Sequence, residues 1–221
     1  MRQFLRKTYL ILVFQIILGA WMPSAGRAQV MAPEQAQQQP AGKFIQDLGN
    51  SAIAVIADKS LTQQQRDDKY HDFLRNAFDL KTIGHFVIAS AWNGATPAQQ
   101  QEYMGLFEKL VVKIYGDRMT FYSGEGFQVK NVHSESDQDF IVSSQVTHPN
   151  GSPPTNIDWR VREKDGKFGI VDVIVEGVSQ SVTQRQEYSS IIQRDGGKID
   201  GLLDVMRQRI QAPPPSTNTA Q

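Results

Sequence analysis

The chain has 221 residues, 40% of them hydrophobic, and its 23 basic and 23 acidic residues balance. This size and composition predict one medium-sized globular domain and exclude a chain that is disordered throughout. Because there is no cysteine, disulfide bonds and a lipidated thiol are excluded, and the hydrophobic core alone must hold the domain together.

The first 28 residues have the order of a secretory signal peptide. Arg2, Arg6 and Lys7 precede the apolar run "TYLILVFQIILGAW", and small residues end the segment at Ala28. The run is shorter than the roughly 20 residues that cross a membrane, so we expect cleavage after Ala28. Cleavage leaves 19 basic and 23 acidic residues, a net charge of −4, which argues against nucleic-acid binding. The sequence predicts a soluble periplasmic protein that begins near Gln29.

Two segments of the mature chain have the composition of flexible ends. Residues 29–42 and 212–221 are rich in Gln, Pro and small residues and lack helical periodicity. We expect a flexible linker at 29–42 and a disordered tail at 212–221. Residues 43–211 contain no internal repeat and no long linker, so they predict a single domain.

The first half of this domain has helical periodicity. We expect helices over residues 43–60, over 61–78, from Asp79 through Ala91, and over 96–122. The last has the clearest start, because Thr96 and Gln99 have capping-box spacing and Pro97 takes the first helical position. Its apolar stripe continues for more than three turns, and such a stripe is usually ordinary core.

After Gly126 the period of the apolar residues changes to two. We expect strands over residues 127–135, 139–148, 156–163 and 167–176, then helices over 178–194 and 198–210. The short connections between the strands indicate an antiparallel meander. The predicted fold class is α+β, with helices wrapped against one face of a twisted, mainly antiparallel four-stranded sheet.

Asp172 is the one acidic residue inside an apolar strand. A two-residue turn at Asp165 and Gly166 would place Trp159 opposite Asp172, where the indole N–H could meet the carboxylate. A slip of one residue would reverse this arrangement. Pairing with Trp159 or an arginine is the plainer interpretation of Asp172, and a role as a general base is the alternative.

The sequence contains few signs of catalysis. The motif G-x-S-x-G is absent, since "GVSQS" lacks the closing glycine, and there is no phosphate-binding glycine loop or dinucleotide fingerprint. The four histidines, His71, His85, His133 and His148, have no metal-ligand spacing, so a zinc site has little support. We expect no enzyme activity and no cofactor.

The strand "KFGIVDVIVE" is apolar on both faces. Ile170, Val171, Val173, Ile174 and Val175 occupy both sides of it, whereas a strand at a protein surface should alternate. Something must therefore cover each face. The sequence leaves open whether helices cover both faces or whether one face lines a cavity.

Two blocks, Phe78–Met119 and Ile157–Leu203, resemble the MlaC family of periplasmic phospholipid carriers, also known as toluene-tolerance auxiliary proteins. The most specific stretch is "VDVIVEGVS" with the "QRQE" that follows it, and "ATPAQ" adds to the resemblance. The resemblance as a whole extends over nearly all of residues 44–210.

The resemblance implies a carrier that holds acyl chains in an apolar cavity between sheet and helices. Its implied partners are a phospholipid, an inner-membrane ABC transporter complex and an outer-membrane lipoprotein–porin complex, with the carrier itself a monomer. One alternative is a carrier of another lipid, such as a hopanoid. The other is a small-molecule enzyme that uses the same pocket with Asp172 as its base. The residues expected to contact lipid are Phe86, Phe107, Val111, Ile114, Tyr115, Met119, Val142, Trp159, Val161, Val171, Val173, Val175 and Val178.

Overall fold

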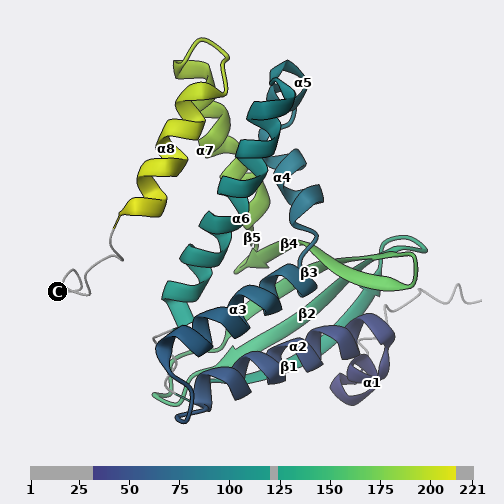
Figure 1. The fold of residues 1–221 in the computed structure, drawn as a ribbon. Helices are drawn as coiled ribbons and strands as arrows, with labels where there is room; N and C mark the ends of the chain where they lie inside the picture. The colour runs from purple at the N-terminus through teal and green to yellow at the C-terminus, as the bar shows by residue number, and fades with distance from the viewer. Residues whose placement is uncertain (1–31, 120–123, 213–221) are drawn as a thin grey trace, which may run out of the picture.

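In this computed structural model the described residues are 32–119 and 124–212 (Figure 1). The expected signal peptide, residues 1–28, and all but the first residue of the expected tail lie outside them. The helices are α1 (Pro33–Gln38), α2 (Pro40–Ala57), α3 (Gln63–Ala77), α4 (Leu80–Ile88), α5 (Ala91–Gly94), α6 (Pro97–Met119), α7 (Gln180–Arg194) and α8 (Asp200–Gln211). The strands are β1 (Gly126–Ser134), β2 (Asp139–Thr147), β3 (Thr155–Lys164), β4 (Lys167–Val175) and β5 (Val178–Ser179).

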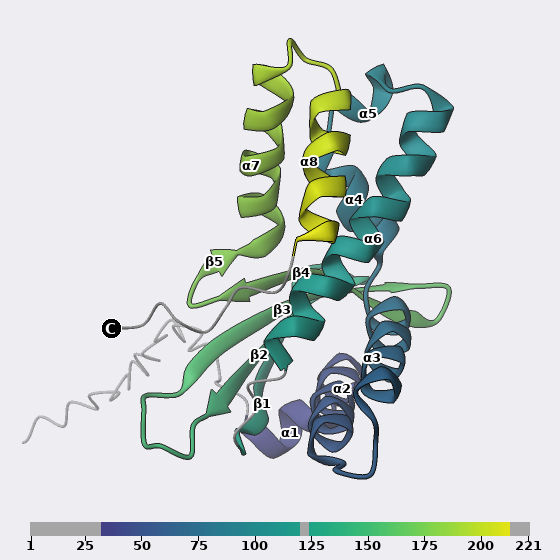
Figure 2. The same ribbon diagram turned by 60° about the vertical axis from the view of Figure 1, so that its left-hand side comes forward.

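The molecule combines an antiparallel sheet with two groups of helices. The strands follow one another in the order β1-β2-β3-β4-β5, and α2 and α3 lie side by side across one face of the sheet (Figure 1). Helices α4, α5, α7 and α8 gather beyond the β4–β5 side and rise away from the sheet, and α6 runs from this group back to α3 (Figure 2). The predicted α+β class and the antiparallel meander are confirmed.

The sheet has five strands rather than the predicted four. The fifth is the two-residue strand β5, which pairs with Ile174 and Val175 of β4. Glu176 and Gly177 both have positive φ, 47° and 79°, which is typical of a type I′ hairpin turn. The chain therefore makes a second tight hairpin before α7 begins at Gln180, where the sequence had predicted helix from residue 178.

Residues 33–42, which we expected to be a flexible linker, form α1 and the start of α2. Proline takes a first-turn position in each helix, where its missing N–H costs nothing. Ala36 and Ala41 are buried, and the Gln37 side chain donates a 3.4 Å hydrogen bond to Val129 O of β1. The expectation was wrong for these residues because α1 is too short to show periodicity and takes its stability from packing on β1, and residues 29–31 lie outside the described part of the chain.

Capping boxes mark the starts of α3 and α6, two of the predicted helices. Thr62 Oγ1 accepts from Gln65 N–H at 3.2 Å, and Thr62 N–H donates back to Gln65 Oε1 at 2.9 Å. Thr96 and Gln99 make the same reciprocal pair at the start of α6, at 3.3 and 2.9 Å. Both capping boxes satisfy amides that the first turn of a helix otherwise leaves unpaired.

Phe78 and Asp79 connect α3, which covers the sheet, to α4, the first of the helices beyond β4 and β5. Phe78 forms an isolated parallel bridge with Ile170 of β4, and Asp79 N–H donates to Ile170 O at 2.9 Å. Asp79 then caps α4, since its carboxylate accepts from Thr82 N–H at 2.9 Å and Thr82 Oγ1 at 2.6 Å. This junction fixes where α4 leaves the sheet.

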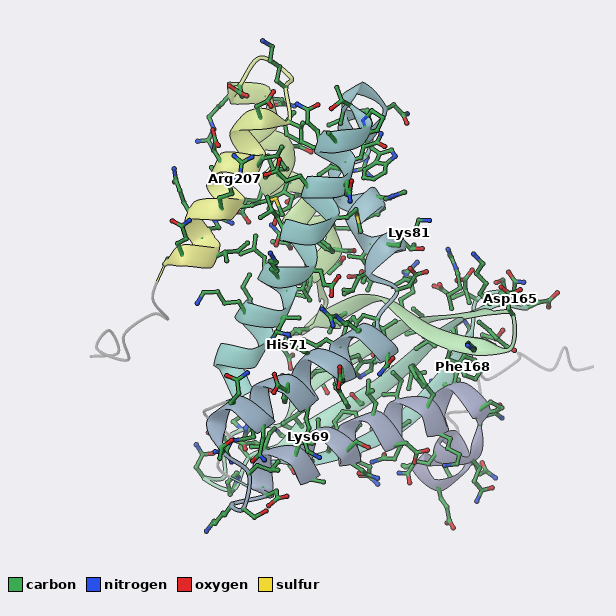
Figure 3. All side chains as sticks on the ribbon, viewed as in Figure 1. Lys69, His71, Lys81, Asp165, Phe168 and Arg207 are labelled. Atoms are coloured by element: carbon green, nitrogen blue, oxygen red, sulfur yellow. The ribbon has the colours of Figure 1, made fainter. Side chains whose placement is uncertain are left out.

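Three apolar clusters hold the fold together. The largest lies among α4, α6, α7 and α8 and includes Tyr103, Phe107 and Leu202. A second lies between the sheet and helices α1 and α2, and a third joins α3 to α6 through Tyr70, Leu74 and Val112. Phe168, labelled in Figure 3, extends the second cluster and packs between Phe44 of α2 and Phe140 of β2, with ring centroids 5.8 and 6.0 Å away.

Candidate ligand-binding pocket

A pocket of about 480 Å³ lies between the helices α2 and α3 and the sheet. Its walls come from the inward stripes of both helices and from strands β1 to β4. The lining residues are Ile45, Leu48, Gly49, Ala52, Ile53, Ile56, Tyr70, Phe73, Leu74, Phe78, Glu125, Gly126, Phe127, Val146, Ile157, Trp159, Val173 and Val175. We call this cavity the main pocket.

The wall of the main pocket is almost wholly hydrocarbon. Among the lining residues that the structure describes, Glu125 is the single charged one. The Trp159 ring meets Phe127 edge to face, with centroids 6.3 Å apart. The indole Nε1 donates to Ser144 Oγ at 2.9 Å, so the polar edge of the ring is satisfied within the sheet. Such a wall suits an apolar ligand, which loses contact with water when it enters.

The strands present their apolar side chains to this pocket because alternate residues share one face of a sheet. Ile157 and Trp159 of β3 lie beside Val175 and Val173 of β4, and the pairing joins Ile157 to Val175 and Trp159 to Val173. These four residues form a continuous floor under α2 and α3. One face of the doubly apolar strand β4 therefore borders the main pocket.

The expected pairing of Trp159 with Asp172 was wrong by one residue. The turn at Asp165 and Gly166 forms as expected, but a β-bulge between Arg160 and Val161 shifts the register. Asp172 consequently lies opposite Arg160, and it faces away from Trp159.

Asp172 instead ties β4 to the start of α7. Its carboxylate accepts hydrogen bonds from Ser181 N–H at 3.0 Å, Ser179 Oγ at 2.6 Å and Val173 N–H at 2.9 Å. Ser179 also caps α7 by accepting from Val182 N–H at 3.1 Å. Since Asp172 is 8% exposed and has three donors, its geometry is that of a structural anchor.

A second cavity, of about 280 Å³, lies on the other side of Val173. Phe78 and Val173 border both cavities, so they separate the main pocket from this second one. The second cavity is lined by apolar residues of α4 and α6 and by polar residues of α7, including Gln184 and Glu187. The far face of β4 is thus covered by protein, chiefly by α7.

The residues that the sequence marked as lipid contacts divide into several groups. Trp159, Val173 and Val175 line the main pocket. Phe107, Val111 and Ile114 line the second cavity, together with Val173. Tyr115 and Met119 belong to α6, but their side chains lie outside the described part of the chain.

The other expected contacts border neither cavity. Val142 and Val161 are fully buried in the cluster between α2 and the sheet, and Val171 is buried as well. Phe86 and Val178 are exposed, at 40% and 54%, and Phe86 lies under the Arg185 guanidinium at 4.9 Å.

The apolar stripes of α2 and α3 were not among the residues expected to contact lipid. Their periodicity is plain, but it shows only which face of a helix is buried and does not show that a gap separates this face from the sheet. The available signal was the pair of aromatic residues on α3, Tyr70 and Phe73, whose side chains are large enough to hold two layers apart.

The described residues contain no group of three His, Asp or Glu side chains placed to bind a metal ion. None of the helices over residues 32–119 and 124–212 combines the length and the hydropathy that crossing a bilayer requires.

The fold is that of an α+β protein with an apolar pocket between its sheet and two of its helices. The family model for MlaC protein matches residues 46–208, and the chain belongs to this family.

The chain is also similar to individual members of the family. It is 24% identical over 213 residues to the intermembrane phospholipid transport system binding protein MlaC of Haemophilus influenzae, covering 95% of both chains. It is 24% identical over 110 residues to the toluene tolerance protein ttg2D of Pseudomonas putida, covering 50% of this chain and 51% of that protein.

A solved structure has the same fold. It is a phospholipid-binding protein from Ralstonia solanacearum in complex with a phospholipid, with a TM-score of 0.66 and 21% identity. The match covers 76% of this chain and 95% of that one.

Proposed function

We propose that this protein is a periplasmic phospholipid carrier that holds acyl chains in the main pocket. The observation that carries the proposal is the lining of that pocket: α2, α3 and strands β1 to β4 line it with apolar side chains, and Glu125 is the single charged residue of the described lining. Membership in the MlaC family and the phospholipid-transport name of the Haemophilus influenzae relative support the same cargo.

The energetics of an acyl chain explain why such a carrier needs partners. Burial of a methylene gains about 0.8 kcal/mol, so one chain of some 15 carbons gains on the order of 10 kcal/mol in an apolar pocket. Spontaneous release into water would be very slow. We propose that the lipid is handed over only when the protein docks on complexes that offer the chains an apolar path, an ABC transporter complex in the inner membrane and a lipoprotein–porin complex in the outer membrane.

The proposed location rests on the first 28 residues, whose order is that of a cleaved signal peptide. Expression of the full chain in a Gram-negative host should yield soluble periplasmic protein with an N-terminus near Gln29. Recovery of the protein from washed membranes would contradict this location.

The cargo is tested with two alanines of α2. Ala52 lines the main pocket, whereas Ala54, two residues further along, is exposed. A carboxylate that faces acyl chains costs several kcal/mol, but much less when the emptied pocket admits water. We therefore expect Ala52→Asp to lose its lipid and stay folded, and Ala54→Asp to keep both lipid and fold.

The measurement is mass spectrometry of an organic-solvent extract of each purified protein, alongside its thermal melting curve. A diacyl phospholipid in the wild type and in Ala54→Asp, but not in Ala52→Asp, supports the proposal. A hopanoid in the extract would identify another cargo for the same pocket. Equal lipid content in the two variants would show that the main pocket does not hold it.

A further inference from the structure

The hydroxyl group of Tyr70 is buried without a hydrogen-bond partner. Tyr70 is 5% exposed, and its hydroxyl oxygen neither touches water nor meets a donor or acceptor. Tyr103, which is also buried, provides the contrast, since its hydroxyl donates to Gly84 O at 3.0 Å. A buried polar group without a partner is uncommon and costs free energy in the empty protein.

The surroundings of Tyr70 are apolar on every side that the structure describes. Leu74 and Val112 belong to the same cluster, and Val55, Ile56 and Phe78 pack against it. Burial raises the pKa of the Tyr70 hydroxyl well above its usual value, so the group is neutral and remains a hydrogen-bond donor at physiological pH. A phenylalanine would fill the same space without the polar group.

Tyr70 belongs to the wall of the main pocket. It lies on α3, between Lys69 and His71, which Figure 3 labels. Three of the side chains that pack around it, Ile56, Leu74 and Phe78, line the same pocket. In the empty protein these side chains cover the hydroxyl, so a ligand must displace them to reach it.

The other polar side chains of the wall are unsuited to donate to a ligand. The Trp159 N–H is already used by Ser144, and the Glu125 carboxylate is an acceptor at neutral pH. Tyr70 is therefore the side chain in the described wall with a donor still available.

We propose that the Tyr70 hydroxyl donates a hydrogen bond to an oxygen of the bound phospholipid. The acceptor is an ester carbonyl oxygen of the glycerol backbone or an oxygen of the phosphate group. The bond fixes the depth of the polar end of the lipid in a pocket that otherwise makes only apolar contacts. This inference rests on the proposed function and adds a residue that distinguishes a phospholipid from a plain hydrocarbon.

The test compares Tyr70→Phe with the control Tyr103→Phe in the full mature protein after its lipid has been removed. The probes are a soluble short-chain phosphatidylglycerol with ester-linked chains and its ether-linked analogue. Binding is followed by the fluorescence of Trp159, which lines the same pocket, and the melting temperature of each empty protein is recorded.

We expect Tyr70→Phe to bind the ester lipid about 2- to 10-fold more weakly than the wild type, as the loss of one hydrogen bond predicts. Its empty form should melt no lower than the wild type, because the removed hydroxyl had no partner. Tyr103→Phe should melt lower, because the buried hydrogen bond to Gly84 O is lost, and should bind lipid normally.

The ether analogue identifies the acceptor. A loss of affinity confined to the ester lipid assigns the bond to an ester carbonyl, and an equal loss for both lipids assigns it to the phosphate group. Unchanged affinity of Tyr70→Phe for both lipids, with a wild type that binds them, overturns this inference and leaves the proposed function intact. A wild type that binds neither lipid overturns the proposed function as well.

Discussion

The indole N–H of Trp159 donates to Ser144 Oγ at 2.9 Å across the β2–β3 pair. Ser144 Oγ in turn donates to Ile157 O at 3.0 Å, so one buried hydroxyl serves both as acceptor and as donor. Ser144 is 2% exposed. Because of these two hydrogen bonds, Trp159 presents only its apolar ring to the main pocket. A buried tryptophan with an unpaired N–H would lower the stability of the fold.

Ser144→Ala should therefore destabilise the protein by about 1–3 kcal/mol, because the indole N–H is left buried without an acceptor. Denaturant unfolding measures the change. Ser143→Ala, on the other face of β2, is the matched control and should change the stability by less than about 0.5 kcal/mol. Equal effects of the two substitutions would show that these two hydrogen bonds contribute nothing.

The sequence could not identify Ser144 as the partner of Trp159. The dipeptide Asp165-Gly166 predicts the hairpin turn correctly, and regular pairing from that turn leads to Asp172. Ile170 and Val171 are both apolar, so the hydrophobic pattern does not show that one of them is passed over in a bulge. The register was thus predictable next to the turn and not beyond the bulge.

Asp172→Asn tests whether this carboxylate is a structural anchor or a catalytic base. An amide replaces one acceptor oxygen with a donor and so disturbs either the bond from Ser179 Oγ or the bonds from the Ser181 and Val173 amides, which end on the other oxygen. We expect a loss of stability of about 1–3 kcal/mol with the lipid content nearly unchanged. A reaction of the purified protein that this substitution abolishes, with the fold intact, would overturn the carrier function.

Asp79 should make the stability depend on acid pH. Its partial burial favours the neutral carboxyl group, but the hydrogen bonds from Thr82 and the charges of Lys164 and Arg162 outweigh this and hold the pKa of Asp79 below its usual value. A folded-state pKa below the unfolded one means that the stabilisation is complete above about pH 4 and is lost as the pH falls through the folded-state value.

Asp79→Ala, which removes the cap of α4, should therefore cost about 0.5–2 kcal/mol at pH 7 and progressively less below pH 4. Urea unfolding of the wild type and the variant across this range measures the difference. Asp72→Ala, at an exposed position of α3, is the control and should change the stability little at either pH. A difference for Asp79→Ala that stays constant into strong acid would contradict the ionised cap.

The pocket itself shows another limit of the sequence. The apolar residues of α2 and of α6 both recur with helical spacing, yet Ala52 and Ile53 line the main pocket, whereas Phe107 packs in the cluster among α4, α6, α7 and α8. Periodicity identifies the buried face of each helix, but the space between two layers depends on how all the layers pack. The fold class could be predicted, and the position of the cavity between α2, α3 and the sheet could not.

Substitution by alanine should raise the stability at Gly105 and lower it at Gly42, and this difference tests the packing of α1. An alanine Cβ at Gly105, an exposed position of α6, would meet nothing within 4 Å. Gly105→Ala should thus stabilise the protein by about 0.5–1 kcal/mol through helix propensity. A Cβ at Gly42 would lie 1.9 Å from Ala36 O and 2.8 Å from Val132 Cγ2.

Since a backbone oxygen cannot move away as the end of a side chain can, Gly42→Ala should force α1 off α2 and β1. We expect it to lower the stability by more than about 1 kcal/mol and to increase hydrogen exchange of the amides of residues 33–39. Thermal melting and hydrogen exchange of both variants provide the comparison. If Gly42→Ala instead stabilises the protein as much as Gly105→Ala does, α1 does not pack against Gly42, and the close contact of Gly42 with Ala36 O is contradicted.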